Sequence, residues 1–282
     1  MDNLVFLAVV FSAIFQASWN FFAKKSSAHK SALLYIGWFG LGLVGVPLAS
    51  IFTDFSQFSP LSVYYILLSG FIHFLYVYLL GRAYTLGDIS VVYPISRGLG
   101  IVLTTVFSHF LALDSISIFG FFGIGLVVSG CFLVASKELK SKSGSEGFWA
   151  AALVALAVSA YSIADSQGVH HVPPLFFIAV MNLSTALFAL PFLMTSLRTP
   201  SIKIIKHHKR EAILVAVGGS SAYLIILWAF QQSQTSYVVA LREFSVVIAS
   251  VLGILFLKEK IYRRKLIALA LLVFGIFLVK IS

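Results

Sequence analysis

The sequence is poor in cysteine and in charged residues. Its single cysteine, Cys131, lies inside an apolar run, so it excludes an intrachain disulfide framework and a cysteine metal site. Only 11% of the residues are charged and 60% are hydrophobic, whereas soluble domains are about 25% charged. A soluble fold of 282 residues cannot hide this much apolar surface, so lipid must cover most of the exterior.

Acidic residues are scarce relative to basic ones, and the net charge is +10. In a soluble protein this excess would suggest nucleic acid. Here the basic residues lie in short loops between apolar runs, so the membrane explains them and we expect no nucleic-acid partner. The N-terminus lacks the basic region of a signal peptide, and the run 4–23 is long enough to stay as a helix.

Long apolar runs dominate the rest of the chain. About 20 apolar residues cross the hydrocarbon as a helix, and helices are required because backbone groups in lipid must pair internally. We therefore expect an all-α membrane protein with ten transmembrane helices. The spans lie near residues 4–23, 32–52, 62–81, 89–110, 116–136, 148–168, 174–195, 212–232, 237–257 and 265–281.

Lysine and arginine are distributed over alternate loops between these spans. They fill the loops after the odd-numbered spans, and the loops after the second, fourth, sixth and eighth spans contain none. The exceptions are Arg97 and Arg242, which lie within spans, and Lys280 near the end. Basic loops face the cytoplasm, which places both termini outside. The alternation also supports the span count, because a missed helix would disturb it.

The two halves of the chain resemble each other. Residues 128–134 align with residues 273–279 at an offset of 145, and five of those seven positions are identical. At the same offset Arg97 aligns with Arg242. Short apolar matches also arise by chance, so the geometry of the halves has to support the repeat.

Each half would contain five helices, which is an odd number. The second half, residues 143–282, must then enter the membrane upside down relative to the first, residues 1–142. We expect two inverted five-helix repeats around a central cavity, an arrangement typical of transporters with a site near the bilayer midplane. Two such halves can open one site alternately to either side, although an old duplication alone also leaves a repeat.

Several short motifs occur in a definite order along both halves. They are Ala17-Ser18-Trp19-Asn20 with Lys24, Ala83-Tyr84 with Gly87-Asp88, Tyr93-Pro94-Ile95-Ser96-Arg97-Gly98, Ala160-Tyr161-Ser162, Arg242-Glu243-Phe244-Ser245 and Phe256-Leu257-Lys258-Glu259-Lys260. In their order, spacing and duplicated context they resemble the ten-helix EamA-like branch of the drug/metabolite transporter superfamily, over nearly the whole chain. The resemblance implies a transporter with a cavity between its halves, and it implies export in many relatives and uptake or exchange in others.

One departure concerns orientation. Many relatives carry a basic loop after the second span, whereas residues 53–60 here contain only the acidic Asp54. We therefore take the orientation from this chain's own charges.

Ionisable groups inside the spans are costly and usually face the protein interior. Arg97 follows Pro94, which removes a helix hydrogen bond and can bend or open the fourth span. The planar fork of Arg97 would then suit the carboxylate or phosphate of an anionic or zwitterionic substrate. The alternative is an ion pair with Glu243 or Asp165. We favour pairing for Arg242 with Glu243, and leave both roles open for Arg97.

Glu243 and Asp165 are also candidates for proton coupling, since a carboxylate in a low-dielectric site holds a proton more readily than one in water. Uniport and exchange stay open as alternatives. The expected substrate-binding residues are Arg97, Arg242, Trp19, Asn20, Tyr76, Tyr93 and Tyr161. Aromatic walls suit flat or cationic metabolites, although aromatic side chains also pack helices well. For His73 we favour a bond to a neighbouring helix over a role in the pore.

No Walker-type phosphate loop and no soluble nucleotide-binding domain occur in the sequence, so transport is driven by a gradient, by an exchange, or by no coupled energy source. We expect no cofactor and no metal, because His170-His171 and His207-His208 lack a spaced third ligand. An enzyme should show His, Asp and Glu clustered at a membrane face, and no such cluster occurs. We also expect the glycines of the fifth span to form a close helix contact, within a monomer or in a homodimer.

The sequence therefore predicts a secondary transporter, not an enzyme, that exports or exchanges a small metabolite by alternating access. We expect it in the cytoplasmic (inner) membrane of a bacterium, with the substrate and membrane lipid as its partners. The alternative is a flippase for a phosphorylated lipid carrier, which would use the same fold.

Overall fold

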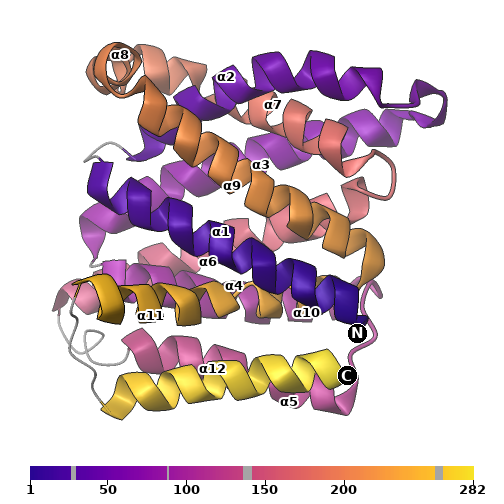
Figure 1. The fold of residues 1–282 in the computed structure, drawn as a ribbon, viewed down its shortest axis with the longest axis vertical. Coiled ribbons are helices and arrows are strands. Elements are labelled where there is room, and N and C mark those ends of the chain that lie inside the picture. Colours follow the sequence, from indigo (N-terminus) through magenta and orange to yellow (C-terminus); the bar gives the residue numbers. More distant parts are fainter. Residues whose placement is uncertain (27–29, 88, 136–141, 258–262) are drawn as a thin grey trace.

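The computed structural model describes residues 1–26, 30–87, 89–135, 142–257 and 263–282. Its helices run side by side across the molecule (Figure 1). They are α1 (Asn3–Ser26), α2 (Lys30–Ile51), α3 (Pro60–Leu86), α4 (Ile89–Phe110), α5 (Ile118–Ala135), α6 (Lys142–Gly168), α7 (Pro174–Met194), α8 (Arg198–His207), α9 (Lys209–Gln232), α10 (Thr235–Leu241), α11 (Phe244–Leu257) and α12 (Arg263–Ile281), with a short 3-10 helix at Phe55–Gln57.

Seven helices in the described part of the chain are long and apolar enough to cross a membrane. They are α2, α3, α4, α5, α6, α7 and α9, each over most of its length. The other three expected spans differ in physical ways. The described apolar part of α1 is the shorter Asn3–Gln16, α12 begins with basic residues, and the ninth span is divided into α10 and α11.

The division of the ninth span corrects the single helix expected over 237–257. The chain leaves the α-helical pattern at Arg242 and Glu243, between α10 and α11. There the amide of Glu243 donates to the carbonyl of Ala240 at 3.2 Å, and the amide of Ser245 donates to that of Arg242 at 3.1 Å. These hydrogen bonds join residues three positions apart, as in a 3-10 helix, and they tighten the turn. By contrast, α4 continues from Ile89 to Phe110 with Pro94 inside it, so no opening is found there.

A further difference is α8, which lies in a segment expected to be only a basic loop. Ser201 and Ile204 are buried on one side, while Ile202, Lys203 and Lys206 are exposed. Ile204 packs in a cluster with residues of α2 and α9. The three-residue spacing of its buried positions explains why this segment forms a helix against the bundle.

The helices pack in a regular order. The α2 helix lies along α7 at one end of the long axis, and α5 lies along α12 at the other (Figure 1). Between these pairs, α3 and α4 both pack on α6, α1 packs on α9 and α11, and α4 contacts α10. Elements from the first and second parts of the chain are therefore interleaved rather than separated.

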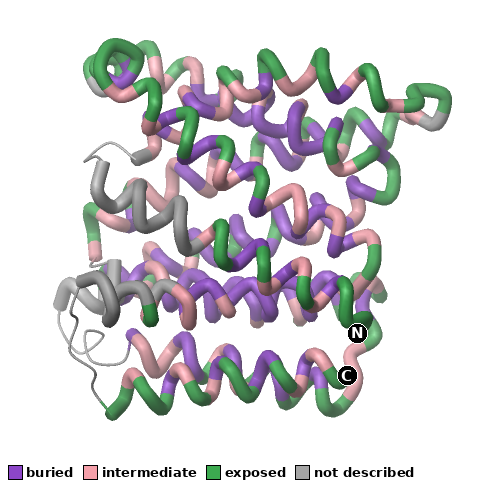
Figure 2. The backbone as a smooth tube through the Cα atoms, viewed as in Figure 1, coloured by how far each residue is buried: buried purple, intermediate pink, exposed green. Residues whose placement is uncertain are grey.

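Burial follows this arrangement. The surfaces where helices meet are buried, and the outward surfaces carry many exposed residues (Figure 2). Large exposed apolar side chains include Leu7 on α1, Phe121 on α5 and Leu214 on α9, at 62%, 65% and 67% exposure. Such surfaces need lipid around them. The apolar helices and these outer surfaces describe a multi-pass membrane protein.

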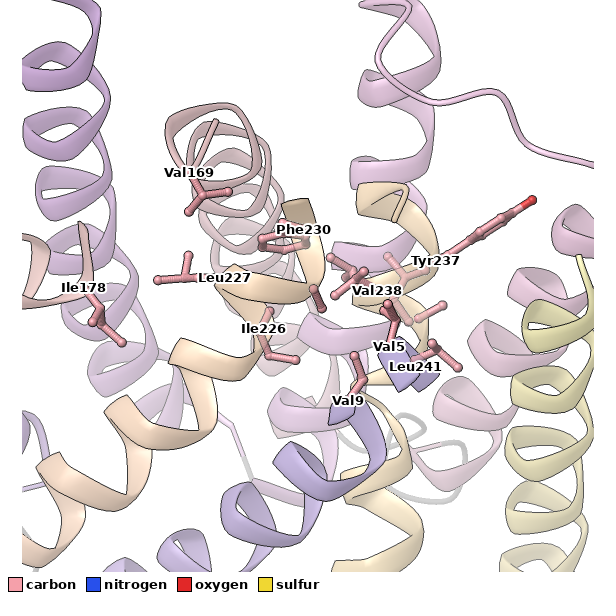
Figure 3. Close-up of a cluster of buried hydrophobic side chains, with 14 of the residues drawn as sticks. Val5, Val9, Val169, Ile178, Ile226, Leu227, Phe230, Tyr237, Val238 and Leu241 are labelled. Carbon is pink, nitrogen blue, oxygen red and sulfur yellow. The ribbon is translucent and has the colours of Figure 1, made fainter. Parts of the chain in front are cut away.

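The largest apolar cluster joins α1, α9 and α10. Val5, Val9, Ile226, Phe230 and Val238 are all buried in it (Figure 3). Tyr237 contributes its ring to the cluster, and its hydroxyl points away (Figure 3). That hydroxyl accepts a bond from the amide of Ser117 at 2.9 Å, which ties α10 to the start of α5.

Glycines bring α5 and α12 into close contact, so the small-residue surface expected on the fifth span packs within one chain. A Cβ atom at Gly123 would lie 2.8 Å from the carbonyl oxygen of Gly275, and one at Gly130 would lie 3.0 Å from that of Ala268. Only glycine allows the backbones to approach this closely. A Cβ at Gly125 would meet no atom within 4 Å, so that glycine faces away from the contact.

Candidate functional site

A cavity of about 120 Å³ lies within the bundle. Its walls come from α1, α2, α3, α4, α6, α7 and α9, together with Arg242 at the turn between α10 and α11. Five tyrosines line it, and they are Tyr76, Tyr84, Tyr93, Tyr161 and Tyr223. Apolar residues such as Ile178, Met181 and Ile226 complete the walls. The cavity therefore combines flat aromatic surfaces with a small number of polar groups, as ligand sites do.

One arginine of the cavity is neutralised by an ion pair. Arg97 of α4 donates from Nε to Oε1 of Glu243 at 2.8 Å, and its Nη2 lies 2.6 Å from the same oxygen. Both side chains are buried, with 4% and 0% exposure. This bond crosses from α4 to the turn between α10 and α11. Replacing either Arg97 or Glu243 with a neutral residue would leave the charge of the other buried without compensation.

Arg242 has a different environment, although it also lines the cavity and is buried. Its guanidinium carbon lies 5.1 Å from the centre of the Tyr223 ring, in a cation–π contact. Its Nε and Nη1 atoms are buried and have no hydrogen-bond partner among the residues that the structure describes. Two donor atoms of Arg242 are therefore buried and unpaired beside the cavity.

A series of polar contacts connects Tyr223 to Asp165 and His73. The Tyr223 hydroxyl donates a short hydrogen bond to Oδ2 of Asp165, and Nε2 of His73 lies 3.8 Å from the same oxygen. The other ring nitrogen of His73 lies 3.0 Å from the carbonyl oxygen of Ser69. His73 and Asp165 are both buried. Asp165 is thus held by α9 and α3, and it does not line the cavity.

Aromatic and amide groups fix the rest of the wall. The ring of His73 lies 4.3 Å from that of Tyr161, and the Tyr161 ring lies 5.4 Å from that of Tyr76. On the side formed by α7 and α9, Nδ2 of Asn182 donates to Oγ of Ser220 at 2.9 Å. These contacts hold the walls in place before any ligand arrives.

The structure brings together most of the residues expected at the site. Arg97, Arg242, Tyr76, Tyr93 and Tyr161 all line the cavity. Glu243 and Asp165 support it from behind, through Arg97 and Tyr223. The side chains of Trp19 and Asn20 lie outside the described residues.

One expectation for the charged residues needs correction. Glu243 pairs with Arg97 and not with Arg242, because neighbouring residues of a helical turn point in different directions. His73 approaches Asp165 on a neighbouring helix, as expected, and it also lines the cavity. Sequence reasoning missed Tyr223, Tyr84 and Asn182. Tyr223 follows Gly218-Gly219-Ser220-Ser221 as a lone aromatic residue, and this was the available signal.

Comparison with known proteins adds a family and a fold. Residues 145–281 match the model of the EamA-like transporter family. A search of curated proteins found no match. Among solved structures, one crystal structure of a protein aligns with 99% of this chain and 96% of its own length, with a TM-score of 0.76 and 16% sequence identity. At that identity the likeness concerns the fold alone.

Proposed function

We propose that this chain, whose residues 145–281 belong to the EamA-like transporter family, is a secondary transporter that exports or exchanges a small metabolite across the bacterial cytoplasmic membrane. One observation carries the proposal. A polar and aromatic cavity lies in the interior of an otherwise apolar bundle, at the place where α3, α4, α6 and α9 meet. Buried arginines inside a membrane protein are costly, so their position around a cavity favours a role in handling solute.

Alternating access by two inverted repeats is the mechanism we propose. If α1 to α5 correspond to α6, α7, α9, α10 with α11, and α12, the contacts of one half have counterparts in the other. The packing of α3 on α6 corresponds to that of α9 on α1, and the packing of α2 on α9 corresponds to that of α7 on α3. The α2–α7 and α5–α12 contacts each join two corresponding helices, so each contact is its own counterpart.

The glycines of α5 and α12 support the same correspondence at the level of residues. At the offset of 145, Gly123 corresponds to Ala268 and Gly130 to Gly275. The close approach of Gly123 to Gly275 then has its counterpart in that of Gly130 to Ala268. Two halves related in this way can rock about a central site and expose it to one side at a time.

Proton coupling is the energy source that the buried acids suggest. Glu243 is held by Arg97, and Asp165 lies between Tyr223 and His73. A proton that binds one of these carboxylates would change the charge balance beside the cavity. Exchange of two solutes without a proton is the alternative, and a proton gradient in the transport assay separates them.

The test is transport of a metabolite panel into and out of proteoliposomes, with and without a proton gradient. Ala222→Phe places a ring into the cavity from α9. Val217→Phe places the same ring on the outer surface of that helix, because Val217 is 43% exposed. We expect a soluble solute to move through the wild type and through Val217→Phe, and we expect Ala222→Phe to block it.

Equal transport by Ala222→Phe and the wild type would show that the cavity is not the route. If no soluble compound moves but a labelled polyprenyl phosphate changes leaflet, the chain is a flippase for a phosphorylated lipid carrier. Measuring both solutes with the same preparation separates these outcomes.

A further inference from the structure

The cavity has two arginines at equivalent positions, and within the described part of the chain only one of them, Arg97, forms an ion pair with an acid. Arg97 and Arg242 correspond at the offset of 145. The next residue is Gly98 in the first half and Glu243 in the second. Glu243 pairs with Arg97, and no corresponding acid exists for Arg242.

The packing around Gly98 explains why that acid is missing. A Cβ atom at Gly98 would lie 3.1 Å from Cβ of Cys131 and 3.2 Å from the ring of Phe132. A carboxylate side chain at this position would require the side chains of Cys131 and Phe132 on α5 to give way. The asymmetry between the halves is therefore built into the packing of α4.

Arg242 receives no full compensation from the groups around it. It lies on the Tyr223 ring, and no salt bridge to it occurs within the described ranges. Oδ2 of Asp165, the other buried acid nearby, accepts the Tyr223 hydroxyl and lies beside His73. Arg242 is buried, with 5% of its surface exposed. Its two unpartnered donor atoms therefore require an acceptor that the described residues do not supply.

We propose that the substrate is a small aromatic carboxylate, a monoanion whose carboxylate binds the guanidinium of Arg242. This inference rests on the proposed function and names the substrate class of its cavity. The planar fork of arginine matches a carboxylate through two parallel hydrogen bonds. The tyrosines Tyr76 and Tyr161 on the cavity wall offer faces and edges to a ring.

The size and charge of the cavity restrict the substrate further. Its volume of about 120 Å³ is close to that of a cavity of about 150 Å³ known to hold benzene, so it has room for one ring. No aspartate or glutamate is among the described residues that line it. A cationic amine would therefore meet Arg242 with no acid to offset it, and the cavity selects against cations.

The first experiment measures binding of benzoate, benzamide and benzylamine to the purified wild-type protein by calorimetry. These probes share one ring and differ in charge. We expect benzoate to bind, with benzamide and benzylamine much weaker. Equal affinity for benzoate and benzamide would overturn the proposal, and so would preferential binding of benzylamine.

The second experiment uses Arg242→Gln, with Arg82→Gln as the control because Arg82 is an exposed arginine at the end of α3. We expect Arg242→Gln to weaken benzoate binding by about ten- to hundredfold, the loss of a charged hydrogen-bonded contact. Arg82→Gln should bind benzoate as the wild type does. Undiminished benzoate binding by Arg242→Gln would overturn the assignment of Arg242.

Folding is followed in the same samples by thermal unfolding without ligand. Removing an uncompensated charge should leave the Tm of Arg242→Gln equal to or above that of the wild type. A large fall in Tm would contradict the unpaired state of Arg242 and so overturn the proposal.

If proteoliposomes transport a neutral or cationic solute and not benzoate, the transport function stands and the anion class fails. If benzoate binds as expected but no solute moves, the anion site stands and transport fails.

Discussion

At the scale of single residues, the cavity is organised by charges that are satisfied in different ways. Arg97 forms an ion pair with a carboxylate, whereas Arg242 lies on the face of the Tyr223 ring. Asp165 is held by a hydroxyl and lies next to a histidine. Each group is buried, so a change at one of them alters the electrostatic balance of the whole site.

The Arg97–Glu243 pair gives a direct prediction of stability. Arg97→Gln and Glu243→Gln each leave one buried charge without its partner, and we expect each to lower the free energy of unfolding by about 3–5 kcal/mol. The double variant removes both charges, so we expect it to be more stable than either single variant. Thermal unfolding in detergent measures this double-mutant cycle. Additive losses in the double variant would show that the two residues do not interact.

The sequence predicted most of these residues but not their partners. Arginines and acids inside apolar runs are conspicuous, so Arg97, Arg242, Glu243 and Asp165 could be selected without a structure. Which acid meets which arginine depends on the direction of side chains on packed helices. Tyr223 was missed for a related reason, since tyrosines are frequent here and only helix packing shows which of them surround the cavity.

At the scale of helices and turns, the connection between α4 and α5 holds the start of α10. Asp114 accepts hydrogen bonds from the amides of Thr235 and Ser236 at 3.1 Å and 2.8 Å, and from the Ser236 hydroxyl. Asp114 is buried. It satisfies amides at the helix start that have no partner within the helix, and it does so from another part of the chain. At the offset of 145 between the two halves, Asp114 aligns with Glu259, which lies outside the described residues.

Removing this cap should loosen α10. We expect Asp114→Ala to lower the free energy of unfolding by about 0.5–2 kcal/mol, the usual range for a lost cap. The neighbouring Ser115→Ala is the matched control, because Gln234 bonds chiefly to the backbone carbonyl of Ser115, at 2.8 Å. Chemical denaturation of both variants checks the prediction. An equal effect of the two changes would mean that Asp114 does not act through its carboxylate.

The contact between α5 and α12 gives a second prediction for a helix pair. Gly123→Val directs a side chain at backbone atoms of α12, the nearest at 2.8 Å, so we expect a loss of about 1–3 kcal/mol in the free energy of unfolding. Gly125→Val points into open space and should be close to neutral. Thermal unfolding of the two variants compares them. Similar losses would indicate a general cost of valine in this helix rather than the contact.

Helix packing also shows which parts of the fold were predictable. Apolar runs located the long helices closely, for example 174–195 against Pro174–Met194 for α7. The break between α10 and α11 was not predicted, because no proline or glycine marks it and the residues on both sides are apolar. The helix α8 was missed because its charge resembles that of a loop, although Ser201 and Ile204 recur at helical spacing.

At the scale of the whole molecule, the ends of the helices form two opposite faces. The two chain termini lie together at one face, and α8 lies at the opposite one (Figure 1). The amino group of Met1 donates to the carbonyl oxygen of Lys280 at 3.2 Å. The basic helix α8 should face the cytoplasm, so the termini should lie outside.

Cysteine labelling tests this orientation. In a Cys131→Ser background, Ser282→Cys places a thiol at the terminal face and His207→Cys places one on exposed α8. We expect a membrane-impermeant maleimide to label position 282 in right-side-out vesicles, and position 207 only after permeabilisation. The cysteine-free variant controls for background. The reverse pattern would invert the orientation.

The contact between Met1 and Lys280 bears on whether the two halves of the chain have to be translated in their present order. Because Met1 bonds to Lys280, two residues before the end of the chain, a short linker can join the two termini without disturbing the bundle, and new ends can be opened between α5 and α6. A circularly permuted gene would then translate the second half before the first. If either half can be synthesised first and still find its partner, the direction in which the ribosome reads the two halves is not what determines how they assemble.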